Sequence, residues 1–343
     1  MSWQRVRGHD ALIESFDRAW RRGRLAHAYL FTGPPGVGKR LFATELAKAL
    51  LCENRPGPRL EACDRCPACA QVEAGTHPDL FSVAQPEDSL VVPIEAMREL
   101  GRNLALKPAR GRGKVAIVDD ADNLNDPATG NAAANCFLKT LEEPPPGSVL
   151  LLIGTNPDLQ LPTIVSRCQL IRFAPLPQPV VAELLRAQGM DDPAVVERLA
   201  RLSGGSLGQA LALADPSLWE FRRRLLEGLA RPRPDTVALA REWTQFVEEA
   251  GKEAAAQRRR AALALRLVID ALTDVLRLRL GAAPLLAEPE DLGLLEGLAK
   301  RVDPDKLLDL LERCLEAGVQ IDRRAQLVLV LEGLMDALGQ QMK

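Results

Sequence analysis

The chain has 343 residues, of which 47% are hydrophobic and 26% charged, a balance typical of folded proteins of two or three domains. Its net charge of −2 argues against a protein that wraps nucleic acid through bulk positive charge. Residues 1–7 lack the apolar core of a signal peptide, and no run of about 18 apolar residues predicts a membrane span. We therefore expect a cytoplasmic protein without membrane contact, in which the seven cysteines serve as thiols or metal ligands rather than disulfides.

A glycine-rich turn lies between the first predicted strand and the second predicted helix. Residues 9–20 have the apolar spacing of an amphipathic helix, residues 28–32 are mostly apolar and rich in β-formers, and residues 41–51 repeat with a helical period. The turn consists of Gly33, Pro34, Pro35, Gly36, Val37, Gly38, Lys39 and Arg40. This order predicts a phosphate-binding loop, because the loop amides and the helix N-terminus direct N–H groups at an anion. The alternative is a glycine turn that only joins a strand to a helix.

The residue after Lys39 is unusual for an NTPase. Lys39 would supply a cation at the β- and γ-phosphates, and the motif then requires Ser or Thr, whose hydroxyl holds the magnesium ion. Arg40 stands there instead. Arginine is always protonated and has no acceptor atom, so it repels a metal ion and cannot ligate it. We expect ATP or ADP to be bound weakly here, or without hydrolysis.

Four cysteines follow the phosphate-loop helix. Cys52 comes first, and Cys63, Cys66 and Cys69 follow with two residues between neighbours. This spacing lets neighbouring sulfurs turn toward one ion, and four thiolates suit a tetrahedral zinc. Because the protein would supply all four ligands, no coordination position stays open, and the zinc would be structural. The alternative is a group of reduced or redox-active thiols.

Two later strands are expected to present polar groups. Residues 114–118 are a largely apolar strand that ends in Asp119 and Asp120, and residues 148–156 predict a second buried strand that could present Thr155 or Asn156 to a γ-phosphate. In NTPases the first of these strands delivers an aspartate beside the metal. The next position is usually a glutamate that orients the attacking water, and here it is Asp120. Aspartate is one methylene shorter than glutamate, and a loss of reach of about 1 Å can cost ~100-fold in rate. Asp119 and Thr155 are candidate nucleotide contacts; the alternative for the first strand is a set of solvated acids.

The remaining pattern divides the chain into three domains. Strands that alternate with helices predict a doubly wound parallel sheet over residues 1–177, with the cysteine module at 52–69. A proline-rich hinge leads into short helices over 178–215, which we expect to form a lid. Every segment from 216 to 343 has a helical pattern, so this region is expected to be an all-helical domain.

Four motifs make the sequence similar to the clamp-loader branch of the AAA+ ATPases. They are the phosphate loop, the four-cysteine insertion, Leu141-Glu142-Glu143-Pro144-Pro145 and Ser166-Arg167-Cys168, in matching order over residues 1 to about 215. The resemblance implies a P-loop NTPase fold with a zinc module, then a helical lid and a collar domain that joins five subunits in a ring. It also implies that Arg167 acts in trans, as an arginine finger on ATP held by a neighbouring subunit. Such a finger contributes ~10³–10⁵ in rate.

Within this family the chain departs from the hydrolysing gamma/tau subunits at three places. Those subunits have a hydroxyl residue at the position of Arg40, a glutamate at that of Asp120 and a sensor arginine at that of Gly208. We therefore expect a largely non-hydrolysing subunit of the bacterial DNA polymerase III clamp loader. It would be a component of the holoenzyme, whose nucleotidyltransferase activity belongs to the whole complex.

The resemblance also implies partners. They are the gamma/tau ATPase and delta subunits and, through the complex, the sliding clamp and primer-template DNA. Two alternatives stay open at this point. One is a gamma/tau-type ATPase, and the other is a zinc-bearing scaffold or adaptor without a nucleotide-linked role.

Overall fold

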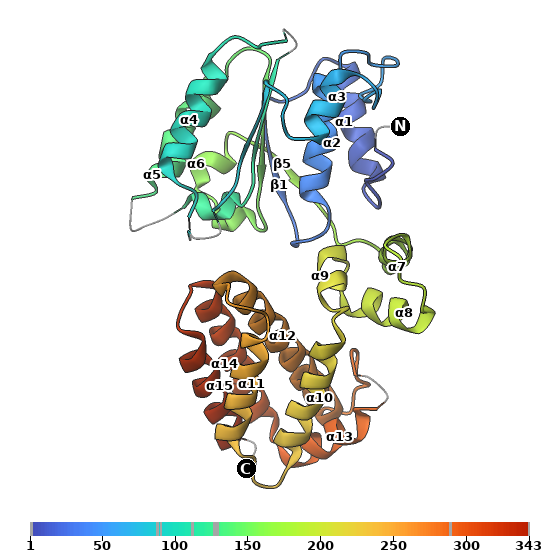
Figure 1. Cartoon of the computed structure of the whole chain (residues 1–343), viewed down its shortest axis with the longest axis vertical. Coiled ribbons are helices and arrows are strands. Elements are labelled where there is room, and N and C mark those ends of the chain that lie inside the picture. The colour runs from blue at the N-terminus through green and yellow to red at the C-terminus, as the bar shows by residue number, and fades with distance from the viewer. Residues whose placement is uncertain are drawn as a thin grey trace. The chain divides into compact units, whose positions relative to one another are not determined.

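The computed structural model describes residues 3–86, 89, 91–110, 113–125, 130–287 and 290–341. The chain divides into two compact units, Met1–Ala210 and Leu211–Lys343 (Figure 1). The first unit includes most of the expected lid, so the three-domain division stays a prediction. In the described parts of both units, no helix is long and apolar enough to cross a membrane.

A five-stranded parallel sheet forms the centre of the first unit and confirms the predicted α/β fold. Its strands lie in the order β2-β3-β4-β1-β5. They are β1 (Ala28–Thr32), β2 (Leu80–Val83), β3 (Lys114–Val118), β4 (Ser148–Ile153) and β5 (Gln169–Arg172). Phe31 of β1 pairs with Ile153 of β4, and Val118 of β3 pairs with Leu152. The residues that follow β1, β3 and β4 are therefore brought to one edge of the sheet, as expected for a doubly wound fold.

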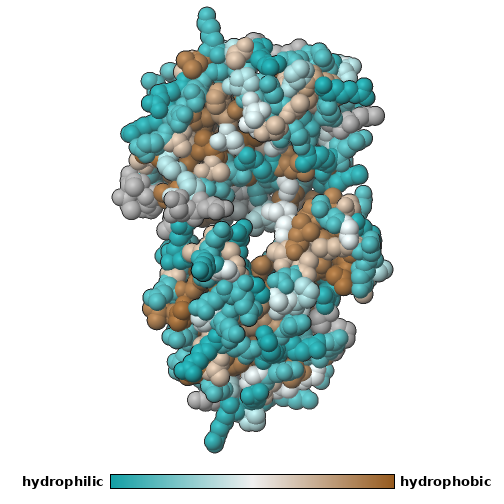
Figure 2. Space-filling model, viewed as in Figure 1, coloured by the Kyte–Doolittle hydropathy of each residue, from teal (hydrophilic) through white to brown (hydrophobic). Residues whose placement is uncertain are grey.

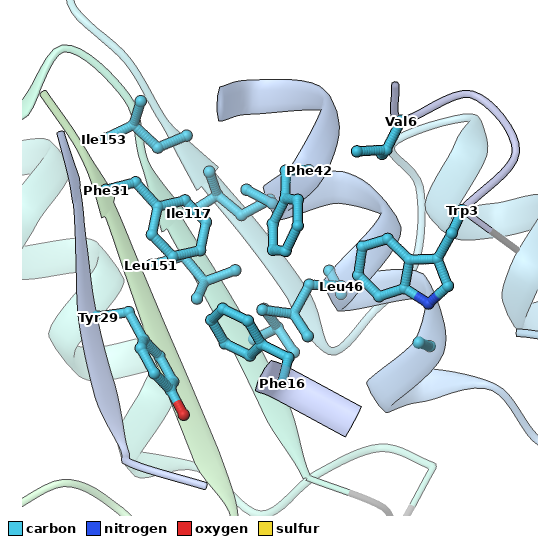
Figure 3. Close-up of a cluster of buried hydrophobic side chains, with 14 of the residues drawn as sticks. Trp3, Val6, Phe16, Tyr29, Phe31, Phe42, Leu46, Ile117, Leu151 and Ile153 are labelled. Atoms are coloured by element: carbon cyan, nitrogen blue, oxygen red, sulfur yellow. The ribbon is translucent and has the colours of Figure 1, made fainter. Parts of the chain in front are cut away.

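Helices cover both faces of this sheet (Figure 1). One face carries α1 (Asp10–Arg21) and α2 (Lys39–Leu51), with α3 (Pro67–Glu73) packed on α2, and the other carries α4 (Ile94–Ala105), α5 (Ala132–Glu142) and α6 (Pro162–Val165). Successive side chains of a strand point to opposite faces, so the central strands β1, β3 and β4, which have helices on both faces, are almost fully buried. Figure 3 shows Phe16, Phe31 and Phe42 packed together between α1, α2 and the sheet. Burial of each phenylalanine contributes roughly 2 kcal/mol and holds α2 against β1.

The remaining elements are helices, which confirms the prediction of an all-helical C-terminal region. The first unit contains α7 (Gln178–Ala187) and α8 (Pro193–Leu202), and α9 (Leu207–Ala212) spans the boundary. The second unit contains α10 (Pro216–Ala230), α11 (Thr236–Glu248), α12 (Ala254–Arg279), α13 (Leu292–Arg301), α14 (Pro304–Asp322) and α15 (Leu327–Gln341). Helix α12 packs against α10, α11, α13 and α14, and α11 packs against α15. Three helix starts combine a capping aspartate with proline at the first turn; the aspartates are Asp192, Asp215 and Asp303.

Candidate functional site

The predicted phosphate loop joins β1 to α2 and requires glycine at three positions. Gly33, Gly36 and Gly38 have φ angles of 138°, 75° and 99°, which residues with side chains rarely adopt. A Cβ on Gly33 would lie 2.2 Å from the carbonyl oxygen of Phe173, and a Cβ on Gly36 would lie 2.3 Å from Ser206 Oγ. The loop is therefore a closely packed turn between the end of β5 and the start of α9.

Lys39, the first residue of α2, is turned back into the loop. Its Nζ donates to the carbonyl oxygens of Gly33 at 2.5 Å and Pro34 at 2.7 Å. Burial of the side chain lowers the pKa of Lys39, while Asp122 and Asp119 act in the opposite direction. Two of the three ammonium donors are thus directed at the loop itself, and a phosphate would have to compete for them.

Arg40 connects the loop to the strands that carry the acids. Its Nη1 donates to Asp119 Oδ2 at 2.8 Å, and its Nη2 donates to Ser82 Oγ, in β2, at 2.6 Å. The second oxygen of Asp119 accepts the N–H of Asp120 at 3.1 Å. In an NTPase a hydroxyl and an aspartate at these two positions hold magnesium. Here the hydroxyl is replaced by a cation, and that cation is paired with the aspartate.

Thr155 lies beside the loop, but its hydroxyl is engaged. The carbonyl oxygen of Thr155 accepts the Gly33 N–H at 2.9 Å. Its Oγ1 donates to Asp122 Oδ2 at 2.6 Å, and the same carboxylate oxygen accepts the Thr155 N–H at 2.6 Å. A hydroxyl has a single proton, so Thr155 cannot donate to a phosphate while this bond is present. Sequence reasoning missed Asp122, which lies in η1 (Ala121–Leu124), because no motif pairs it with Thr155.

Gly208, at the position expected for a sensor arginine, touches the phosphate loop. Its N–H donates to the carbonyl oxygen of Gly36 at 3.4 Å. A Cβ on Gly208 would lie 3.3 Å from the Gly36 Cα. The start of α9 therefore rests on the loop through backbone contact, and a side chain at residue 208 would push against the loop.

Arg167 lies in the turn between α6 and β5, away from the phosphate loop. Tyr29 of β1 pairs in parallel with Gln169 of β5, so Arg167 lies toward the amino ends of the strands, whereas the loop follows the carboxyl end of β1. The four residues of β5 span about 13 Å. Nη1 of Arg167 donates to the Thr163 carbonyl at 2.9 Å, and Nη2 donates to Glu142 Oε1 at 2.5 Å. The phosphate loop and Arg167 thus lie at opposite ends of the strands of one sheet.

The four predicted cysteine ligands come together as one cluster. Their Sγ atoms all lie within 4.8 Å of one another, and the closer pairs are 3.5 to 4.0 Å apart. A tetrahedron with metal–sulfur bonds of about 2.3 Å has edges of roughly 3.8 Å, so the spacing fits zinc. Cys52 ends α2, Cys66 caps the N-terminus of α3 and Cys69 lies in its first turn. Helix α3 was not predicted, because its seven residues are too few for a helical period to show.

Backbone groups support the charge of these sulfurs. The N–H of Cys63 donates to Cys52 Sγ, and the N–H of Cys66 donates to Cys63 Sγ, both at 3.3 Å. Burial alone would raise the pKa of Cys66, but N–H donors from Cys69 and Glu53 lower it to about 6. Burial raises the pKa of Cys52 and of Cys69 instead. A metal binds the thiolate form and releases the proton, so it is the geometry of the four sulfurs that fits zinc.

A buried group of ions connects α2 to the cysteine module. Lys48 Nζ lies 3.0 Å from Glu45 Oε2, 3.0 Å from Asp64 Oδ1 and 3.4 Å from Glu73 Oε2. Burial alone would lower the pKa of Lys48, but hydrogen bonds to Glu45 and Asp64 outweigh this effect and raise it. Because Asp64 lies in the cysteine loop and Glu73 ends α3, Lys48 holds three segments together.

Comparison with known proteins places the chain in a family. A family model described as "DNA polymerase III, delta subunit" matches residues 8–177. The DNA polymerase III subunit delta' of Escherichia coli (strain K12) is 33% identical over 300 residues, which cover 87% of this chain and 84% of that protein. The chain belongs to the delta-prime family of DNA polymerase III subunits.

Two further similarities are to other DNA polymerase III proteins. The DNA polymerase III subunit tau of Escherichia coli (strain K12) is 34% identical over 218 residues, but the match covers 62% of this chain and only 32% of tau. The crystal structure of a DNA polymerase III gamma subunit-related protein from Thermotoga maritima has a TM-score of 0.50 at 17% identity, over 96% of this chain and 99% of that one. The second similarity shows that the fold is shared. A delta-prime chain thus combines a fold found among gamma-related proteins with the altered loop described above.

Proposed function

We propose that this delta-prime family chain is a largely non-hydrolysing subunit of the DNA polymerase III clamp loader and lends Arg167 to ATP held by a neighbouring subunit. One observation carries the proposal: Arg40 stands at the position of the magnesium-binding hydroxyl and pairs with Asp119, the carboxylate that would bind the same ion. Arg167, in contrast, lies partly exposed at the other end of the strands. The chain would thereby assist hydrolysis that it does not itself perform.

Loss of hydrolysis in this chain is supported by how its own phosphate loop is satisfied. Arg40 pairs with Asp119, Thr155 donates to Asp122, and Lys39 donates to loop carbonyls. Each of these groups would have to exchange its present partner for a phosphate or a metal ion. ATP or ADP would therefore be held weakly, and without the magnesium needed to stabilise charge in the transition state.

Action of Arg167 in trans is supported by its position. Arg167 cannot reach the phosphate loop of its own chain, because the loop lies at the carboxyl ends of the strands and Arg167 lies toward their amino ends. The side chain is 33% exposed, so its guanidinium can meet an anion presented by another subunit. A planar guanidinium with five N–H donors matches the oxygens of a phosphate group.

A zinc ion held by Cys52, Cys63, Cys66 and Cys69 would have a structural role. With four thiolates around it the metal has no open position, so it activates neither water nor substrate. The module is anchored to the C-terminus of α2, the helix that begins at the phosphate loop. We propose that zinc fixes this helix rather than taking part in chemistry.

Assembly with partner subunits is supported by an exposed apolar stripe on α14. Leu308, Leu315 and Val319 are 54%, 61% and 50% exposed, and their spacing places them on one side of the helix. The buried side of α14 is formed by other residues, which include Leu310 and Cys314. Figure 2 shows apolar patches on a largely hydrophilic surface. We propose that gamma/tau and delta subunits cover such surfaces in the cytoplasmic complex, and that the sliding clamp and primer-template DNA are reached through the complex.

The decisive experiment reconstitutes a loader from this chain and a competent gamma-type ATPase subunit and compares wild type with Arg167→Ala. We expect the alanine variant to lower the ATP turnover number of the complex ~10³-fold, because the transition-state charge loses its partner. Arg172→Ala, a change of an arginine in the adjoining strand, is the matched control and should leave turnover unchanged.

Two outcomes would contradict the proposal. Unchanged turnover with Arg167→Ala would favour a zinc-bearing scaffold without a nucleotide-linked role. Brisk magnesium-dependent ATP turnover by the isolated chain, abolished in Lys39→Ala, would favour a gamma/tau-type ATPase. The two measurements are independent, so each rival can be excluded separately.

A further inference from the structure

We infer that Glu142 is a positioning residue for Arg167, an inference that rests on the proposed function. Glu142 is the last residue of α5, and its Oε1 accepts a hydrogen bond from Arg167 Nη2 at 2.5 Å. The same guanidinium donates through Nη1 to the Thr163 carbonyl at 2.9 Å. Two separate elements, the ends of α5 and α6, therefore hold one arginine.

The backbone around Glu142 fixes where its carboxylate lies. Helix α5 stops at this residue because prolines follow at 144, 145 and 146 and cannot continue a helix. Buried Phe137 and Leu141 anchor the helix in the core beneath the sheet. A carboxylate at a firmly packed helix end is a fixed point, whereas an arginine side chain is long and has many rotamers.

The contacts leave part of the guanidinium available to a ligand. Arginine has five N–H donors in a plane, and Arg167 directs donors to Glu142, Thr163 and, at 3.4 Å, to Ser166 Oγ. Further donors of the same plane can address an anion while the bond to Glu142 is kept. Glu142 and Arg167 are 50% and 33% exposed, and such a pair adds little to stability. Its effect is therefore on orientation, and a small misplacement of a reacting group is costly in rate.

The experiment measures ATP turnover by the reconstituted loader, with kcat and KM determined separately. We expect Glu142→Ala to lower kcat ~10-fold with KM and the melting temperature unchanged, because the finger is misplaced while the neighbour's ATP site is intact. Glu142→Gln keeps an oxygen acceptor at the same place and should restore at least half of the lost activity. Glu143→Ala, the adjacent exposed carboxylate, is the matched control and should have no effect.

A second set of variants separates this inference from the proposed function. In an Arg167→Ala background, Glu142→Ala should cause no further loss, because a positioning residue acts only through its arginine. If Arg167→Ala alone leaves kcat unchanged, the proposed function fails. If Arg167→Ala lowers kcat as expected but Glu142→Ala has a kcat equal to or above that of wild type, only the inference about Glu142 is overturned. A further loss in the double variant would also overturn it.

Discussion

The phosphate loop and the Arg167 turn are built in opposite ways. The loop begins a helix of 13 residues whose other end carries a ligand of the cysteine cluster. The Arg167 turn follows a helix of four residues and is held by one carboxylate and a backbone carbonyl. Each region contains an arginine paired with a carboxylate of its own fold, but Arg40 lies beside the phosphate loop at the carboxyl ends of the strands, whereas Arg167 lies toward their amino ends.

Under the proposed function, the same kind of ion pair has opposite consequences in the two regions. Asp119 is the acid that a metal would need, so its pairing with Arg40 removes a ligand from the site. Glu142 is not at a metal-binding position, so no metal ligand is lost when it pairs with Arg167, and further N–H donors of the guanidinium can still address an anion. The surroundings of each pair, rather than its strength, determine what the arginine does. Three changes test this comparison.

Removal of zinc should affect the anchored region most and the Arg167 turn least. Cys66→Ser deletes one of the four thiolates of the proposed zinc site, and we expect the variant to bind no zinc and to lose at least about 3 kcal/mol of stability, because metal binding contributes directly to folding. Metal analysis and hydrogen exchange check this, with faster exchange expected in α3 and the end of α2 but not in the residues between α6 and β5. Cys136→Ser is the control, since Cys136 lies on α5 outside the cluster. An equal rise in hydrogen exchange in α3 and between α6 and β5 would contradict the prediction that the metal stabilises only the region around the phosphate-loop helix.

Loss of Lys48 should weaken the same anchor to a similar or smaller degree. Lys48 and Glu45 are 8% and 1% exposed, and breaking a buried pair costs about 3 kcal/mol when the remaining charge loses its partner. Arg5 Nη1 stays 3.8 Å from Glu45 Oε1, so the loss should be at or below this figure. We expect Lys48→Met to show this loss in urea unfolding. Arg18→Met, which removes the exposed Arg18–Glu14 pair, should cost less than about 1 kcal/mol.

The pH dependence of this effect has a definite sign. Because the pKa of Lys48 is raised in the folded chain, its contribution is complete below the ordinary value of 10.5 and decreases as the pH rises above it. The difference in stability between wild type and Lys48→Met should therefore shrink in strongly alkaline solution. A difference that grows there would contradict the assigned partners.

Reopening the loop should have the smallest effect of the three. Arg40→Ser restores a hydroxyl and releases Asp119, so magnesium should strengthen binding of ADP about tenfold, or roughly 1.4 kcal/mol. Isothermal titration with and without magnesium measures this. Arg40→Lys keeps a cation at the position and should show no response to the metal. Turnover should not return, because Asp120 and Gly208 are unchanged; a variant as insensitive to magnesium as wild type would show that Asp119 is not what excludes the metal.

Residue patterns predicted most elements of the first unit correctly. The central strands β1, β3 and β4 could be recognised because short apolar runs, bounded by glycine or polar residues, are typical of buried strands. The cysteine cluster was predictable because its spacing is typical of a four-thiolate metal site. Arg40 could be recognised as unable to bind a metal from its chemistry alone.

The partners of the predicted residues could not be read from the sequence. Ser82 and Asp119 meet Arg40 only because β2 and β3 are neighbours in the sheet. Glu142 and Arg167 belong to different helix ends that are 25 residues apart in the chain. The engagement of Thr155 by Asp122 likewise depends on tertiary structure. Local patterns specify which groups exist, while the fold decides which of them are already satisfied.

The approach of Gly208 to Gly36 limits how this lineage can change. An arginine acquired at residue 208 would first meet the Gly36 Cα, 3.3 Å from its own Cβ, before its charge could reach a nucleotide. A side chain at residue 208 therefore requires the phosphate loop or the start of α9 to shift by a few tenths of an ångström.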